Sequence, residues 1–151
     1  MQESKRIVVV GPGAIGGITA ALMKKAGLDV TLVCKHQEIA TLAAGRGLRL
    51  TGVKGEATVT VNAVAAVEEL KGVYDIALIA TKAYDMPAAA RQLLPFIAED
   101  TPVLSLQNGI CTDALAAAVG RARTVGCVIG WGATMHGPGE LEMTSTGDFI
   151  I

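Results

Sequence analysis

Short apolar runs alternate along this chain with segments in which apolar residues recur at helical spacing. The run Arg6–Val10 leads into a glycine-rich segment, after which Ile15, Ile18 and Leu22 fall on one face of a helix. Two lysines and a glycine, which suit the end of a helix, precede the next apolar run, Asp29–Val33. This order predicts a strand, a helix and a second strand.

The same alternation continues through the rest of the chain. Residues 48–51 and 57–61 alternate apolar and polar side chains around a turn, which predicts a hairpin of half-buried strands. Residues 75–80 form a continuous apolar run, typical of a central parallel strand covered on both faces. We therefore predict an α/β fold of the Rossmann type, a doubly wound, mainly parallel sheet with a hairpin insertion. The remaining expected elements are helices at 38–44, 87–97 and Thr112–Val119 and strands at 102–106, 124–129 and 149–150.

The glycine-rich segment between the first strand and the first helix suits a bound dinucleotide. Its first glycine permits a tight turn, its second lets the backbone approach a pyrophosphate, and its third lets the helix pack against the strand. The helix N-terminus then presents unpaired N–H groups to the phosphates. A purely structural glycine turn is the alternative, but strand and helix signals flank the motif as a dinucleotide site requires. The predicted cofactor-binding residues of this segment are Gly11, Pro12, Gly13, Ala14, Ile15 and Gly16.

The residues after the second strand bear on which dinucleotide is bound. NAD-binding domains place an Asp or Glu there, and its carboxylate holds the 2′-hydroxyl of the adenosine ribose. This chain has Cys34, Lys35 and His36 instead. A lysine suits the 2′-phosphate that distinguishes NADP(H) from NAD(H), and a solvated surface lysine is the alternative. Because the acid is missing, we predict NADP(H), with Lys35 at its 2′-phosphate and a smaller contribution from His36.

Two further polar segments follow predicted strands, at the sheet edge where such folds bind their ligands. Lys82 would place a positive charge beside a cofactor or an anionic substrate. Asn108 offers a donor and an acceptor that would bridge ribose and substrate. Taken singly, both are ordinary turn residues. Their occurrence together, beyond a dinucleotide motif, favours a site, and we predict both to bind cofactor and substrate.

Composition argues against several other classes of function. A length of 151 residues with 51% hydrophobic and 3% aromatic content fits one globular domain with an aliphatic core. A net charge of −1 gives no basic field for nucleic acid, and no apolar run predicts a membrane span. The three cysteines show no paired spacing and the two histidines no ligand spacing, so we expect a cytoplasmic protein without a metal site.

Four segments together resemble the ketopantoate reductases (2-dehydropantoate 2-reductases), and the resemblance covers essentially the whole chain. They are Gly-Pro-Gly-Ala-Ile-Gly-Gly from Gly11, Val-Thr-Leu-Val-Cys-Lys ending at Lys35, Thr-Lys-Ala-Tyr-Asp from Thr81, and Leu-Gln-Asn-Gly from Leu106. The resemblance implies hydride transfer from NADPH to the keto carbon of 2-dehydropantoate, which gives pantoate for pantothenate and coenzyme A synthesis. It implies that Lys35 stands where a basic residue, commonly arginine, holds the 2′-phosphate, and that Lys82 and Asn108 line the nicotinamide and substrate cleft. Lysine cannot form the planar bidentate pair of arginine.

The resembled family also has a second, helical domain that carries a general-acid lysine and the residues that bind the keto acid substrate. We therefore expect residues 1–151 to be the NADP(H)-binding domain, with no catalytic residue in this chain. Such a domain would bind NADP(H) but turn over little or no substrate, because hydride transfer also needs a proton source and a closed cleft. Two alternatives stay open, namely another NAD(P)-dependent hydroxyacid or sugar-nucleotide dehydrogenase and a non-catalytic dinucleotide-sensing domain. The oligomeric state, including a homo-oligomer, stays open as well.

Overall fold

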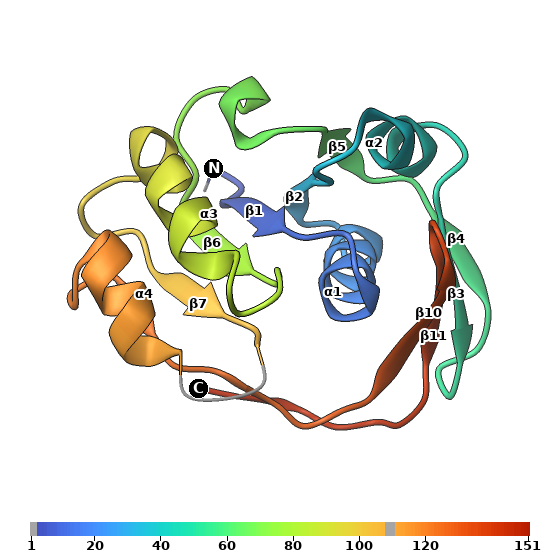
Figure 1. The fold of residues 1–151 in the computed structure, drawn as a ribbon. Coiled ribbons are helices and arrows are strands. Elements are labelled where there is room, and N and C mark those ends of the chain that lie inside the picture. Colours follow the sequence, from blue (N-terminus) through green and yellow to red (C-terminus); the bar gives the residue numbers. More distant parts are fainter. Residues whose placement is uncertain (1–2, 108–110) are drawn as a thin grey trace.

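The computed structural model describes residues 3–107 and 111–151. Its main sheet has the spatial order β5-β2-β1-β6-β7-β8, and every neighbouring pair in it is parallel. The first strand of the chain therefore lies in the middle, and later strands extend the sheet to either side, which confirms the predicted Rossmann arrangement (Figure 1). The strands of this sheet are β1 (Arg6–Val10), β2 (Asp29–Val33), β5 (Asn62–Val64), β6 (Ile76–Ile79), β7 (Val103–Ser105) and β8 (Thr124–Val125).

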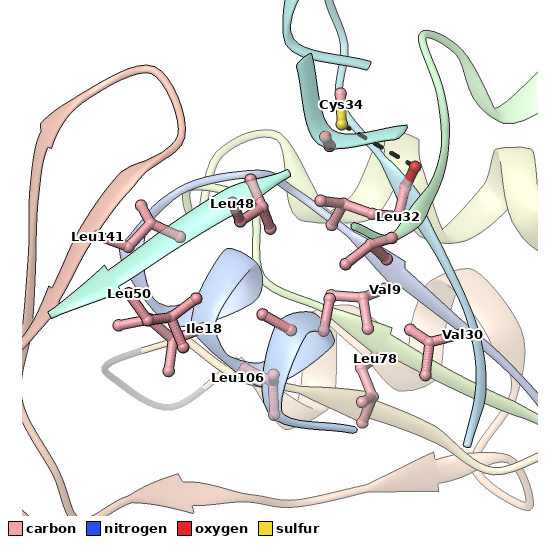
Figure 2. Packing of buried hydrophobic residues seen from close by; sticks show 14 of the residues in the cluster. Val9, Ile18, Val30, Leu32, Cys34, Leu48, Leu50, Leu78, Leu106 and Leu141 are labelled. Carbon is pink, nitrogen blue, oxygen red and sulfur yellow. Dashed lines mark hydrogen bonds between the residues drawn. The ribbon is translucent and has the colours of Figure 1, made fainter. Parts of the chain in front are cut away.

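The central strand β1 divides its side chains between two hydrophobic clusters, one on each face of the main sheet. Ile7 and Val9 belong to the cluster that includes residues of α1 and α2, whereas Val8 and Val10 belong to the cluster that includes residues of α3 and α4. All four side chains are buried, as expected of a parallel strand covered on both faces. Figure 2 shows the first cluster around Ile18 of α1. The helices are α1 (Ala14–Lys25), α2 (Gln37–Ala44), α3 (Met86–Leu93) and α4 (Thr112–Val119).

Helix α1 ends in the glycine cap that the sequence predicts. Gly27 has a φ of +90°, and its N–H donates to the carbonyl oxygen of Lys24 at 2.9 Å. The N–H of Leu28 donates to the carbonyl oxygen of Met23 at 3.1 Å. This pair of bonds is a Schellman motif, which satisfies the last carbonyl groups of the helix and directs the chain into β2. No helix within residues 3–107 or 111–151 is long and apolar enough to cross a membrane.

A second, mixed sheet packs against α1, which lies between it and the main sheet (Figure 1). The predicted hairpin is present as the antiparallel pair β3–β4, but it is half of a larger sheet of order β10-β11-β3-β4. Strand β11 pairs in parallel with β3 and antiparallel with β10. Gly17 permits the close approach to α1, since a Cβ there would lie 2.5 Å from Cδ1 of Leu141. These strands are β3 (Leu48–Gly52), β4 (Ala57–Val59), β10 (Ala133–Gly137) and β11 (Glu140–Met143).

The helix predicted at 87–97 is shorter than expected. α3 ends at Leu93, and the chain continues as a short 3-10 helix, Leu94–Phe96. The reason is Pro95, which has no N–H to donate and whose ring clashes with the preceding turn of an α-helix.

The strand predicted at 124–129 is also wrong as a single element. It divides at Gly126 into β8, in the main sheet, and β9 (Val128–Ile129), which pairs antiparallel with β12 (Phe149–Ile150). Glycine in a strand interior is the least restrained residue and permits this change of direction.

Candidate functional site

The glycine turn joins the carboxyl end of β1 to α1 through tight backbone contacts. Gly11 has a φ of +114°, and its N–H donates to the carbonyl oxygen of Val33 at 3.0 Å. A Cβ at residue 11 would lie 2.7 Å from the carbonyl oxygen of Ala80, and one at Gly16 would collide with the carbonyl oxygen of Gly11. Both positions therefore require glycine to bring the turn, the helix and the end of β6 together.

Gly13 has a different environment from Gly11 and Gly16. Its φ of −67° is open to any residue, and no described atom lies within 4 Å of the position that a Cβ would take. As the N-cap of α1 it offers no side-chain hydrogen bond, and the first turn of α1 contains no acidic residue. The first N–H groups of the helix and the positive end of its dipole therefore lie without a protein side chain to neutralise them, as an anion-binding helix N-terminus requires.

The turn opens into a cleft of about 670 Å³, a volume typical of ligand and cofactor sites. The cleft lies at the carboxyl ends of β1, β2 and β6, beside the point where the strand order changes direction. Six of the residues predicted from the sequence line it together, although they come from three separate segments. They are Gly11, Pro12, Gly13, Lys35, His36 and Lys82.

The remaining predicted cofactor residues are Ala14, Ile15, Gly16 and Asn108. Ala14, Ile15 and Gly16 form the first turn of α1 and are not among the residues that line the cleft. Gly16 packs this turn of the helix closely against the glycine turn. Asn108 lies outside the residues that the structure describes.

Lys35 lines the cleft and occupies an uncommon backbone conformation. Its φ is +65°, and within residues 3–107 and 111–151 every other residue with a left-handed φ is a glycine. The N–H of His36 donates to the carbonyl oxygen of Cys34 at 2.7 Å, so the three residues form a tight γ-turn. Strain of this kind concentrates at ligand sites. The turn leaves the side chains of Lys35 and His36 exposed along the cleft wall.

Cys34, which precedes Lys35, contributes no negative charge at this end of β2. Its side chain is buried in the cluster beside α1, and burial raises the pKa of its thiol to about 12. The group is therefore a neutral thiol at physiological pH. The position at which an NAD-binding domain carries a carboxylate thus holds an uncharged side chain, followed by a cationic one.

The cleft has two walls that the sequence analysis missed. One is the 3-10 helix Val67–Glu69, which follows β5 and brings Glu68 to the cleft. The other is the end of the β10–β11 hairpin, with Met135, Pro138 and Gly139. The run Gly-Pro-Gly at 137–139 signals a turn, but no local pattern indicates that this turn returns to the first glycine motif. Within the described part of the chain, no group of three His, Cys, Asp or Glu side chains is arranged to hold a metal ion.

Comparison with known proteins identifies the family. The model of the family described as ketopantoate reductase PanE/ApbA matches residues 7–151. The chain belongs to the ketopantoate reductase family. The 2-dehydropantoate 2-reductase of Pyrococcus abyssi is 32% identical over 146 residues, which make up 97% of this chain and 47% of that relative. That of Aquifex aeolicus is 25% identical over 147 residues, or 97% of this chain and 46% of the relative.

Solved structures of the family agree in fold. The crystal structure of 2-dehydropantoate 2-reductase from Geobacter metallireducens GS-15 superposes with a TM-score of 0.83 at 31% identity. The matched region covers 95% of this chain and 48% of that one. The chain therefore spans about half the length of the ketopantoate reductases it matches.

Proposed function

We propose that this chain is the NADP(H)-binding domain of a 2-dehydropantoate 2-reductase, an NADP-dependent oxidoreductase of pantothenate synthesis. The observation that carries the proposal is the convergence of the glycine turn, Lys35 and Lys82 on one cleft at the carboxyl edge of a Rossmann sheet. The relatives support the choice of substrate, since they are 2-dehydropantoate 2-reductases.

The residues that surround the cleft fit the parts of NADP(H). We infer that the turn from Gly11 to Gly16 holds the pyrophosphate at the uncapped N-terminus of α1. We assign the 2′-phosphate to Lys35, with His36 beside it, because both are exposed on the same wall and the neighbouring Cys34 is uncharged. Lys82, after β6, is assigned to the nicotinamide end and to the substrate carboxylate. Asn108 keeps this role as a prediction from the sequence alone.

The fit to a dinucleotide rests on space as well as charge. The open side of Gly13 lets the backbone approach a ligand in a way that any Cβ would obstruct. When bound, NADPH supplies the hydride that reduces the keto carbon of 2-dehydropantoate to the alcohol of pantoate. The chain's own contribution is to bind the cofactor, orient it and surround part of it with protein.

The proton donor and most of the substrate site are assigned to the part of the relatives that this chain does not match. That part amounts to about half of their length. Reduction of a ketone needs a proton for the developing alkoxide and a cleft from which water is excluded. We therefore expect the 151-residue chain alone to bind NADPH without appreciable turnover of 2-dehydropantoate. The three cysteines are free thiols, in keeping with a cytoplasmic location.

Substitution of Lys35 tests the assignment of the cofactor. Lys35→Ala removes a charge-assisted contact to the 2′-phosphate, so we expect NADPH affinity to fall about tenfold and NADH affinity to stay within about twofold. Fluorescence titration of both nucleotides against wild type and variant measures this. An equal loss for NADPH and NADH would refute the role of Lys35 at the 2′-phosphate.

A further inference from the structure

We propose that Gln107 is a positioning residue of this site: its side-chain amide holds the Thr81–Lys82 segment and thereby sets where the Lys82 ammonium enters the cleft. The proposal rests on the proposed function, since it assumes that Lys82 faces bound NADP(H). Gln107 is not among the residues that line the cleft, whereas Thr81 and Lys82 are. It therefore acts through them.

The amide of Gln107 bridges the segments that follow two neighbouring strands. Its Nε2 donates to the carbonyl oxygen of Thr81 at 2.7 Å and to the hydroxyl of Thr81 at 3.1 Å. A longer contact of 3.5 Å reaches the carbonyl oxygen of Lys82. On its other side, Oε1 of Gln107 accepts from the hydroxyl of Ser105 at 3.0 Å. Because carbonyl oxygens only accept hydrogen bonds, the atom that faces them must be the amide nitrogen, and the orientation of the side chain is settled.

The position of this bridge explains why it matters. Among residues 3–107 and 111–151, the last backbone bond between these two strands is the donation from the N–H of Leu106 to the carbonyl oxygen of Ile79 at 2.8 Å. Gln107 lies two residues beyond the end of β7 at Ser105, and its side chain holds the Thr81 peptide there. Within the described residues, no other group donates to the carbonyl oxygen of Thr81.

Lys82 depends on such an anchor more than a short side chain would. It is exposed, and the lysine stem has several rotatable bonds, so the location of its charge follows from the placement of its backbone. Ser105, which orients the amide of Gln107, is 6% exposed and is the last residue of β7. The chain of contacts thus runs from a buried strand end through Gln107 to the carbonyl group of Thr81, which forms the peptide bond with Lys82. The hydrogen bonds along it, at 3.0 Å and 2.7 Å, are of ordinary length.

The test is a double-mutant cycle between Gln107 and Lys82, read as NADPH affinity of the 151-residue chain by fluorescence titration. Gln107→Glu keeps the size of the side chain but removes the donors and turns a carboxylate toward carbonyl oxygens. We expect Gln107→Glu and Gln107→Ala to weaken NADPH binding about fivefold or more in the wild-type background. In the Lys82→Ala background, the same changes are expected to alter affinity less than about twofold.

Two controls separate positioning from general damage to the fold. Gln37→Ala removes another glutamine whose Nε2 also donates to a threonine hydroxyl, that of Thr41 at 3.2 Å, on an exposed face of α2. It is expected to leave NADPH affinity unchanged. Ser105→Ala removes only the bond that orients the Gln107 amide, and is expected to change affinity in the same direction but less. It also provides a milder variant should the Gln107 variants be too unstable to titrate.

The outcomes distinguish this inference from the proposed function. If wild type binds NADPH and Lys35→Ala weakens that binding selectively, but the effect of Gln107 is absent or equal in both Lys82 backgrounds, the positioning role is overturned and the cofactor assignment stands. If wild type shows no saturable NADPH binding, the proposed function fails and this inference fails with it.

Discussion

Gly13 and Gly16 of the glycine turn are expected to have separable tasks, one in ligand binding and one in packing. Glycine to alanine in a helix ordinarily stabilises by about 1 kcal/mol. At Gly16, however, the added Cβ would collide with the carbonyl oxygen of Gly11 and lie 2.9 Å from Cβ of Ala80. Backbone cannot rotate away as a side chain does, and overpacking of this kind costs about 1–3 kcal/mol. Alanine at residue 16 is therefore expected to lower the stability of the protein instead of raising it.

We expect Gly16→Ala to lose about 2 kcal/mol of unfolding free energy, which corresponds to a fall of about 4–8 °C in Tm for a domain of this size. Gly17→Ala is the matched control in the same helix turn. Its Cβ would meet Cδ1 of Leu141, the end of a side chain rather than backbone, at 2.5 Å. Because a side-chain end can shift where backbone cannot, and because the helix gains propensity, the expected change is within about 1 kcal/mol.

Gly13→Ala is the complementary substitution. No described atom lies within 4 Å of the new Cβ, and the backbone φ of −67° suits alanine, so the expected loss of stability is only that of replacing a glycine N-cap, less than about 1 kcal/mol. The Cβ would instead stand in the cleft, and NADPH affinity is expected to fall about tenfold or more. Thermal unfolding followed by circular dichroism and NADPH titration measure the two effects. A Gly16→Ala protein as stable as wild type, or a Gly13→Ala protein that binds NADPH normally, would refute this division of roles.

Three further predictions concern Cys34 and Lys35, the residues that follow β2. Iodoacetamide at pH 8 is expected to modify the partly exposed Cys111 and Cys127 and to leave Cys34 unmodified until the protein unfolds. Peptide mass spectrometry locates the modified residues. Rapid labelling of Cys34 in the native protein would contradict its burial. The pKa of the Cys34 thiol rises on folding from 9.0 to about 12. Its contribution to stability is therefore present below pH 9 and is lost as pH rises toward 12. The free energy of unfolding of Cys34→Ala is expected to fall less steeply with pH over this range than that of wild type. Lys35 has a φ of +65°, so the Lys35→Gly protein is expected to be about 1 kcal/mol more stable than the Lys35→Ala protein, with a Tm about 2–4 °C higher. Both variants are expected to lose the same NADPH affinity. Identical melting of the two would argue against a strained turn.

The parts of the fold that the sequence predicts correctly are those governed by local signals. The apolar run Arg6–Val10, the helical spacing that follows it and the cap at Gly27 coincide with β1 and α1. The association of the β10–β11 hairpin with β3 could not be read in this way. It joins residues about ninety positions apart, such as Leu50 and Leu141, and depends on the apolar face that α1 presents to both. Edge strand β5 is three residues long, too short for a periodic signal.

The candidate site, like the fold, could be predicted only in part from the sequence. Lys35 and Lys82 were predictable, because parallel strands carry their next residues to the same edge of a sheet, and the cleft does bring both to the glycine turn. Glu68 and Met135 were not, because they reach the cleft through a 3-10 turn and a distant hairpin. Gln107 lay within a recognised motif, yet its partner in Thr81 becomes apparent only when the ends of β6 and β7 are seen side by side.

A crystal structure of the chain grown with NADPH tests the central claim most directly. The account predicts the pyrophosphate against the N–H groups at the start of α1 and the 2′-phosphate in contact with the Lys35 ammonium. Absence of nucleotide from the glycine turn, or a ribose held by the Glu68 carboxylate with Lys35 turned to solvent, would contradict it.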